Sequence, residues 1–192
     1  DGTISTVAGN GGTVYSGDGR PARETSTVPH AITFDPNGSI VFSDLNNFRV
    51  LRLGVDGTLT TIAGNGTRDF SGDGGAARSA SITNVDGMTY DRAGNLILCD
   101  TSASRIRMVS PSGTITTIAG TGELAANGSG GAPARASIGF PTSVAIDSQG
   151  RILLNDLYNG ALWRMTGTSS IQIVTGEQRF KVFPPRTAAA LA

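Results

Sequence analysis

The chain is poor in the residues that build disulfide, metal and redox sites. Its 192 residues include one cysteine, one histidine and one tryptophan. The single cysteine, Cys99, excludes an internal disulfide framework, and it lies in an apolar run typical of a buried strand. No His-x-His or Cys-x-x-Cys spacing occurs, so the sequence predicts neither a metal site nor a bound cofactor.

An excess of one charge and long hydrophobic runs are missing as well. Lysine and arginine together number 15, as do aspartate and glutamate, so the formal net charge is zero. Proteins that bind nucleic acids usually carry a basic excess, because phosphate contacts supply most of their affinity. We therefore expect no nucleic-acid partner. No apolar run approaches the roughly 20 residues that cross a bilayer, so we expect no direct membrane insertion.

What the chain does contain is a repeat of 55 or 56 residues. Three runs mark it: Thr6 to Gly11 (TVAGNG), Thr61 to Gly66 (TIAGNG) and Thr117 to Gly122 (TIAGTG). Two sets of aspartates keep the same step: Asp35, Asp91 and Asp147, and Asp44, Asp100 and Asp156. Self-similarity at a fixed period predicts units that each bury an apolar face against the next unit.

The sequence of each repeat predicts four short antiparallel strands. In the second copy they cover residues 87–91, 96–100, 105–109 and 114–119, with turn residues between them. The first copy has its strands at 31–35, 39–44, 49–53 and 58–63, and the third at 143–147, 151–156, 162–165 and 170–175. Helix-period patterning is absent, and four strands per unit of this length are typical of a β-propeller blade. The sequence therefore predicts an all-β fold with three four-stranded blades.

The expected ring is incomplete. We divide the chain into the outer strand of a preceding blade (1–9), three blades (10–64, with a long entry loop, 65–120 and 121–176) and a C-terminal extension or linker (177–192). Propellers close with four to eight blades. We expect further blades of the same polypeptide to complete the ring. A homodimer with six blades is the less favoured alternative, because an extra strand at Thr3 to Ala8 would compete with the partner's edge.

Two motifs resemble the NHL-repeat β-propeller family. The run Asp-x-x-x-x-Arg-[Ile/Val] occurs at Asp44 to Val50 and at Asp100 to Ile106. A long Gly-rich loop at residues 64–77 resembles a recurrent NHL subtype and has relatives at 15–22 and 128–134. The resemblance covers about residues 1 to 176 and implies the propeller fold. Proteins of this family include protein-binding modules, RNA-binding surfaces, parts of large extracellular proteins and a metal-dependent lyase.

The recurring aspartates are expected to be structural. We interpret Asp44 with Arg49, and Asp100 with Arg105, as pairs that tie the second strand of a blade to its third. In the third blade the arginine position is Ala161. Losing one partner of a buried pair would be costly, so Asp156 should find another donor. Asn159 and Arg164 are the candidates for that donor.

Residues that differ between equivalent positions are better candidates for binding. His30, Asp86 and Thr142 begin the innermost strand of each blade and would surround the channel mouth, where they either contact a ligand or only cap strand ends. Tyr15 and Phe70 occupy matching loop positions, where they either pin the loops or anchor a partner. No catalytic residue is predicted, since carboxylates repeated around a ring do not converge on one point and no Gly-x-Ser-x-Gly motif occurs.

Three glycosylation sequons begin at Asn37, Asn65 and Asn127. All three lie in expected turns, where Asn-Gly also serves as ordinary turn chemistry. The sequons favour an extracellular or cell-surface glycoprotein, and a cytoplasmic setting is the alternative.

These observations favour a non-enzymatic propeller segment of a larger protein that serves as an interaction or scaffold module for a protein partner. The first alternative is a metal-dependent lyase or lactonase-type enzyme whose ligands lie on further blades. The second is an RNA-binding NHL surface.

Overall fold

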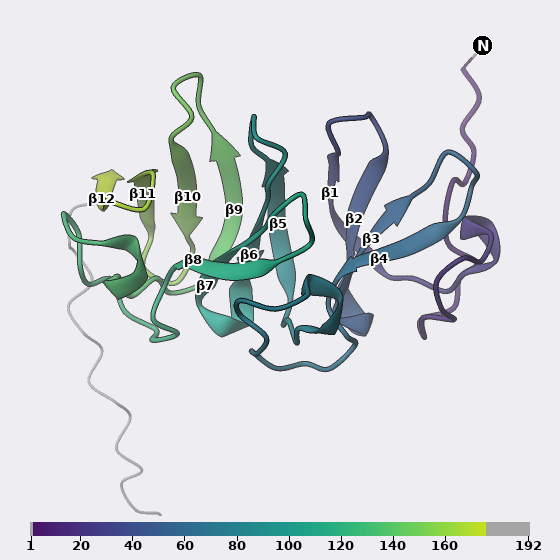
Figure 1. Cartoon of the computed structure of the whole chain (residues 1–192), viewed down its shortest axis with the longest axis horizontal. Coiled ribbons are helices and arrows are strands. Elements are labelled where there is room, and N and C mark those ends of the chain that lie inside the picture. The colour runs from purple at the N-terminus through teal and green to yellow at the C-terminus, as the bar shows by residue number, and fades with distance from the viewer. Residues whose placement is uncertain (1, 176–192) are drawn as a thin grey trace, which may run out of the picture.

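The computed structural model describes residues 2–175, so the extension predicted over 177–192 lies outside the described range. Within this range the fold is all-β, with short 3-10 turns and no α-helix, and no helix is long and apolar enough to cross a membrane. The strands form three separate four-stranded antiparallel sheets in chain order (Figure 1), which confirms the predicted propeller blades.

The first sheet contains β1 (Pro29–Phe34), β2 (Ile40–Asp44), β3 (Arg49–Leu53) and β4 (Leu59–Ala63). The second contains β5 (Val85–Tyr90), β6 (Leu96–Asp100), β7 (Arg105–Val109) and β8 (Ile115–Ala119). The third contains β9 (Pro141–Ile146), β10 (Ile152–Asp156), β11 (Ala161–Thr166) and β12 (Ser170–Thr175).

A recurring aspartate shapes the turn between the first two strands of every sheet. The Asp35 carboxylate accepts backbone hydrogen bonds from Asn37 and Ser39, each 2.9 Å long. Asp91 and Asp147 accept equivalent bonds in the other two turns. An aspartate that satisfies the N–H groups two and four residues ahead favours a tight turn. These three carboxylates therefore have structural partners.

Adjacent sheets pack through opposite faces. In each sheet we call the face that carries Ile32, Met88 or Val144 the leading face, and the face that carries Val41, Ile97 or Leu153 the trailing face. The trailing face of the first sheet, with Val41, packs on the leading face of the second, with Met88. The trailing face of the second sheet, with Ile97, packs on the leading face of the third, with Val144. The molecule is therefore an arc of three sheets joined twice in the same way.

The innermost strands β1, β5 and β9 lie side by side along the arc. Their approach is close between the second and third sheets, where a Cβ atom at Gly87 would lie 2.7 Å from the carbonyl oxygen of Thr142. Only glycine fits there without moving the backbone. Equivalent positions of the three repeats are thus brought to the inner edge of the arc.

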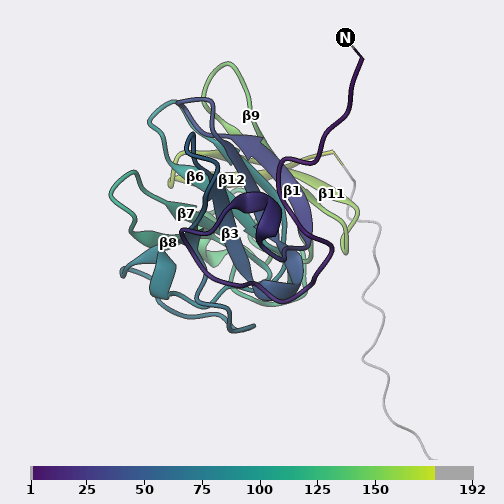
Figure 2. The ribbon, with the colours of Figure 1, turned by 90° about the vertical axis from the view of Figure 1, so that its right-hand side faces the viewer.

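Thr3 to Ala8, predicted as the outer strand of a preceding blade, forms no strand within the described range. Within the described range the first strand begins at Pro29, and the preceding segment is irregular apart from the 3-10 turn η1 (Ala22–Glu24). A strand forms only when its backbone groups pair with a neighbouring strand, and the described chain offers this segment no free strand beside it. Figure 2 shows the N-terminal segment and η1 in front of the first sheet, at the end of the arc.

Candidate functional site

The three channel-mouth residues occupy the same backbone feature. In each first strand one residue is skipped in the pairing with the second strand: the register passes from Val85 to Gly87 in β5 and from Pro141 to Ser143 in β9. Asp86 and Thr142 are therefore bulge residues. His30 lies in the corresponding irregularity of β1, between Pro29 and Ile32. Such bulges redirect one side chain away from the regular alternation of a strand, and they are common beside binding sites.

Two of these three residues meet. His30 Nε2 lies 3.6 Å from Asp86 Oδ1, and the two side chains are 50% and 24% exposed. Asp86 accepts no hydrogen bond from any residue in the described range, which sets it apart from the recurring aspartates. Thr142 turns elsewhere, since its hydroxyl donates to Asn155 Oδ1 at 3.0 Å. The site at the inner edge is therefore a pair formed by a half-exposed His30 and a largely buried Asp86.

The aspartates at the end of each second strand are capped by the chain that precedes the blade. Asp44 accepts from the Val28 backbone at 2.8 Å and from the Asn47 amide at 2.8 Å. Asp100 accepts both the backbone N–H and the hydroxyl of Thr83. Burial raises the pKa of Asp44 and of Asp100 above the ordinary value. Their role is to hold the start of each blade.

The expected Asp–Arg pairs make no hydrogen bond or ion pair in the described range, although the Arg49 charge acts to lower the pKa of Asp44. Each arginine stands opposite its aspartate in the strand register, but among the described residues neither forms an ion pair with it. Arg49 donates to the carbonyls of Gly64 and Asn65, 3.0 and 2.8 Å away. Arg105 donates to the carbonyls of Ala103 and Thr121. The arginines thus donate to backbone carbonyls of the loop that follows each blade and, for Arg105, also to a carbonyl in the turn between β6 and β7.

One strand position that the sequence analysis did not single out places a cation or a hydrogen-bond donor beside two of the aspartates that end the second strands. The third residue of each third strand is Leu51, Arg107 or Trp163. Arg107 is fully buried and lies 3.6 Å from Asp100 Oδ2. Trp163 Nε1 donates to Asp156 at 3.2 Å, and Leu51 offers no donor at all. The signal was an arginine and a tryptophan at a position that is aliphatic in the first copy.

Asp156, whose arginine is absent, has a full set of donors. Asn159 donates to it from its amide at 2.6 Å and from its backbone at 3.1 Å, as expected. Gly139 adds a backbone N–H at 2.8 Å. Arg164, the second expected donor, makes no bond to this carboxylate. Trp163 takes that place because its indole N–H points along the same face.

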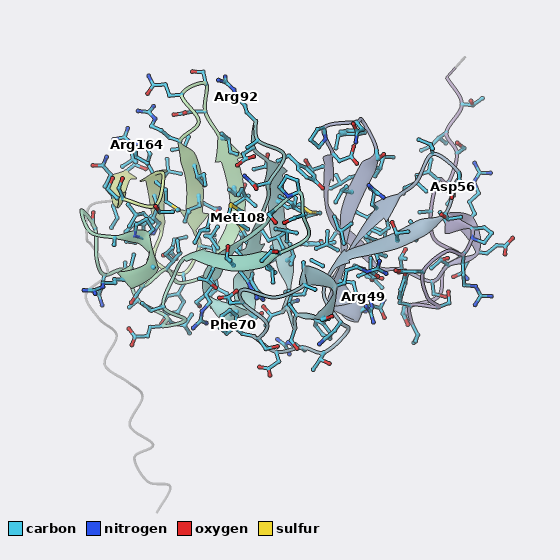
Figure 3. All side chains as sticks on the ribbon, viewed as in Figure 1. Arg49, Asp56, Phe70, Arg92, Met108 and Arg164 are labelled. Atoms are coloured by element: carbon cyan, nitrogen blue, oxygen red, sulfur yellow. The ribbon has the colours of Figure 1, made fainter. Side chains whose placement is uncertain are left out.

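The aromatic loop residues lie against arginines. The Arg49 guanidinium carbon is 5.3 Å from the Tyr15 ring centre. Phe70 lies between Arg105 and Arg107, at 3.9 and 4.9 Å. Figure 3 shows Phe70 and Arg49 on the side of the arc where the long loops lie. These contacts hold each loop against its own blade.

An open cavity of about 410 Å³ separates the first two loops and is lined by Tyr15, Asp18, Arg49, Thr61 and Arg78. Asp18 is saturated there: it accepts from the Tyr15 hydroxyl, from both N–H and hydroxyl of Thr61, and from Arg78. Burial alone would raise the pKa of Asp18, but these donors hold it below the ordinary value. The cavity is thus polar, and the charge and hydrogen-bonding capacity of Asp18 are satisfied by other residues that line it.

The remaining sequence candidates are placed as follows. Cys99 is buried, and burial raises the pKa of its thiol. Asn37 is exposed in a turn and Asn127 is exposed in an isolated β-bridge with Ser137, while Asn65, also exposed, donates its amide to Ser79 and Ser81. In residues 2–175 no three side chains of His, Cys, Asp or Glu gather closely enough to hold a metal ion.

Comparison with solved structures places this arc among β-propellers. An auxiliary nutrient binding protein from Bacteroides ovatus superimposes with a TM-score of 0.58 at 18% identity over 76% of this chain. A gluconolactonase from Xanthomonas campestris gives a TM-score of 0.54 at 17% identity over 78%. Virginiamycin B lyase from Staphylococcus aureus gives 0.53 at 19% identity over 83%. At these identities the likeness shows the fold, a β-propeller arc.

The chain spans less than half of each of these proteins: 39% of the nutrient binding protein, 48% of the gluconolactonase and 43% of the lyase. A comparison with protein-family models finds no match. A comparison with curated proteins finds no match either. The neighbours include both enzymes and binding proteins, so the likeness alone does not choose between these functions.

Proposed function

We propose that this chain is an NHL-type β-propeller segment of a larger protein and that it serves as a non-enzymatic module that holds a protein partner at the inner edge of the arc. The motifs Asp44 to Val50 and Asp100 to Ile106 support the NHL assignment. The mixed set of structural neighbours includes nutrient binding proteins, which is compatible with a binding role.

One observation carries this proposal. The recurring carboxylates have backbone or side-chain donors that occupy them, whereas Asp86 has only His30 at 3.6 Å. A partly buried carboxylate without hydrogen-bond donors gains most from a donor on an incoming partner. Asp86 and His30 are also the residues that break the repeat symmetry at an exposed position. The partner group that fits them is a basic or hydrogen-bond-donating side chain.

The test starts from partners captured on the immobilised full chain and verified with purified proteins by calorimetry. We expect Asp86→Asn and His30→Ala each to weaken binding of such a partner about tenfold, the loss of roughly one charge-assisted hydrogen bond. Asp56→Asn, an exposed change in the turn between β3 and β4, is the control and should leave the affinity unchanged. Equal affinities for all four proteins would refute the proposed site.

The lyase or lactonase alternative makes a different prediction for the same variants. Lactone hydrolysis by the purified chain that requires a divalent cation, and that His30→Ala abolishes, would replace the binding role with catalysis. Salt-sensitive binding of single-stranded RNA that survives Asp86→Asn would instead favour an RNA surface.

We place the module outside the cell or at its surface, in line with the exposed sequons at Asn37 and Asn127. Secretion from a eukaryotic host followed by glycosidase treatment tests this setting. A mass shift that Asn37→Gln, Asn65→Gln and Asn127→Gln together remove is expected, and Asn10→Gln, at an exposed asparagine outside any sequon, is the control.

A further inference from the structure

The open cavity beside the first long loop carries an excess of positive charge. Its volume is about 410 Å³, and its charged lining residues are Asp18, Arg49 and Arg78. Both arginines remain protonated at physiological pH, so two positive charges and one negative charge leave a formal charge of +1. The cavity shares no residue with the His30–Asp86 pair at the inner edge. It is therefore a separate site from the one proposed above.

Arg78 keeps hydrogen-bond donors that the protein does not use. Its Nη2 atom donates to Asp18, whereas its Nε–H and Nη1–H groups donate to no residue in the described range. The Arg78 side chain is 63% exposed, so an incoming ligand can reach these groups. Arg49, in contrast, is held in place, because both of its Nη atoms donate to loop carbonyls and its guanidinium lies over the Tyr15 ring. Arg78 is therefore the arginine that is available to a ligand, and Arg49 adds its charge.

The first loop adds further free donors to the same cavity. Within residues 2–175, neither the backbone N–H nor the hydroxyl of Ser16 forms a hydrogen bond, and the Gly17 N–H forms none either. The equivalent serine of the second loop, Ser71, is bonded through both groups: its N–H donates to the Ser81 carbonyl at 3.4 Å, and its hydroxyl accepts from the Ser81 N–H at 3.2 Å. Successive free backbone N–H groups favour an anion. The first loop therefore offers an anion the donors that the second loop uses within the fold.

The cation that meets the loop aspartate also differs between the two repeats. In the second repeat the buried Arg107 donates to Asp73, and the position equivalent to Arg78 is Ala134. In the first repeat Leu51 replaces the buried arginine, so the cation comes from Arg78 on the next loop. A buried guanidinium is closed to a ligand, whereas an exposed one is open. An accessible cation and free loop donors thus occur together in the first repeat and not in the second.

We propose that this cavity binds a small organic carboxylate, which accepts hydrogen bonds from Arg78, from the N–H and hydroxyl of Ser16, and from the Gly17 N–H. One carboxylate balances the single excess charge of the lining. A phosphate group carries about two negative charges at neutral pH and would place the second one near Asp18. Hydrogen bonds between a guanidinium and a carboxylate are about twice as strong as neutral ones, so Arg78 supplies most of the affinity.

Nuclear magnetic resonance titration of the full, isotope-labelled chain at pH 7 tests the proposal. With D-glucuronate as the probe, the backbone N–H signals of Ser16 and Gly17 should shift and saturate with a Kd on the order of 1 mM, as suits one charge-assisted contact in an open site. Methyl D-glucoside, which lacks the carboxylate, should cause no shift, and inorganic phosphate should bind at least about tenfold more weakly.

A free organic acid and an acidic side chain of a protein both present the carboxylate, and a further probe distinguishes these two sources. The α-amide of N-acetylglutamate carries the group on an amino-acid side chain. Tighter binding of glucuronate would identify a free acid as the ligand, and tighter binding of the glutamate derivative would identify a protein side chain. Either result supports the carboxylate site.

Three variants separate ligand binding from loop structure. Arg78→Ala should weaken glucuronate binding about tenfold or more, and Ser16→Ala, which leaves the hydrogen bonds of Asp18 intact, about threefold. Arg23→Ala is the matched control and should bind as the wild type does, because the exposed Arg23 holds the position equivalent to Arg78 in the preceding loop but does not line the cavity. Unshifted signals from the strands check that each variant is folded.

Four results would overturn the proposal. They are the absence of a saturable shift at about 100 mM glucuronate, a hundred times the expected Kd, an equal affinity for phosphate, an unchanged affinity in Arg78→Ala, and a loss in Arg23→Ala as large as that in Arg78→Ala. The last result would mean that the general charge of the loops attracts the acid, without a defined site.

Discussion

The first and second repeats hold the same long loop in two different ways. In the second repeat the buried Arg107 reaches the loop and donates to Asp73 and to the carbonyl of Ser71, both at 2.8 Å. In the first repeat that arginine is Leu51. There Asp18 turns to Thr61 of β4 and to Arg78, which belongs to the next loop. The second loop is thus held by an arginine of its own third strand, whereas the first is held by Thr61 of its own fourth strand together with Arg78 of the next loop.

The difference shows how a repeat tolerates substitution at a buried position. What the loop aspartate requires is a set of donors, and the fold provides several routes to them. The third repeat illustrates a further route, because Ser129 replaces the aspartate and accepts from the backbone of Ile173 at 3.1 Å. In every repeat this loop residue accepts hydrogen bonds, but different residues supply the donors.

We expect the largest loss of stability when position 107 of the second repeat is given the residue of the first repeat, leucine. Arg107→Leu would leave Asp100 buried in sheet two without its nearest cation and Asp73 without its donor. Breaking a buried ion pair from one side costs about 3–5 kcal/mol. We expect a loss of that size in the free energy of unfolding, measured by urea denaturation at one protein concentration.

Arg105→Leu is the control for this experiment. Arg105 also covers Phe70, but it donates only to loop carbonyls and lies nearer the surface. Its loss should cost roughly 1–2 kcal/mol, the range for ordinary hydrogen bonds. If both variants lost the same stability, the Arg107 network would have no special role.

Trp163→Phe tests the third repeat, where an indole replaces the guanidinium. Phenylalanine keeps most of the buried packing but removes the N–H that reaches Asp156. A hydrogen bond to a charged group contributes about 1.5–3 kcal/mol, and we expect a loss near the lower end, since Asn159 and Gly139 still donate. In an Asp156→Asn background the same change should cost less; an unchanged cost would assign the whole effect to packing.

Tyr15→Phe is expected to cause the smallest loss of stability, and it tests how the first loop is held. Burial, together with the hydrogen bond to Asp18, raises the pKa of Tyr15 from 10.0 to about 12. The neutral phenol therefore contributes stability that is fully present below pH 10 and is lost as the pH rises through about 12. At neutral pH the variant should lose about 1 kcal/mol or less.

The measurement is the difference in unfolding free energy between wild type and Tyr15→Phe as a function of pH. This difference should shrink between pH 10 and 12, because only the wild type must ionise the phenol. A difference that stays constant over this interval would show that the Tyr15 hydroxyl is not linked to folding.

The repeat, the strand positions and the propeller fold were predictable from the residues alone. Strand alternation, β-branched runs and turn residues are local signals, and their recurrence at 55 or 56 residues gives each signal three times. Tertiary structure decided which donors meet which carboxylates. Arg49 and Arg105 donate to backbone carbonyls instead of their cross-strand aspartates, whereas Arg107 lies 3.6 Å from Asp100 and Trp163 donates to Asp156.

The same division holds for the surfaces of the arc. The sequence alone shows that His30 and Asp86 differ at equivalent positions, but the bulges and the packing of β1 on β5 bring the two side chains within 3.6 Å. Whether Ile32 is covered, as Met88 and Val144 are, depends on a neighbouring sheet that no local pattern encodes. Local periodicity determines what each strand is, because it is set by nearest neighbours in the chain. Contacts between residues far apart in the chain decide what each side chain meets, because they exist only after the sheets have packed.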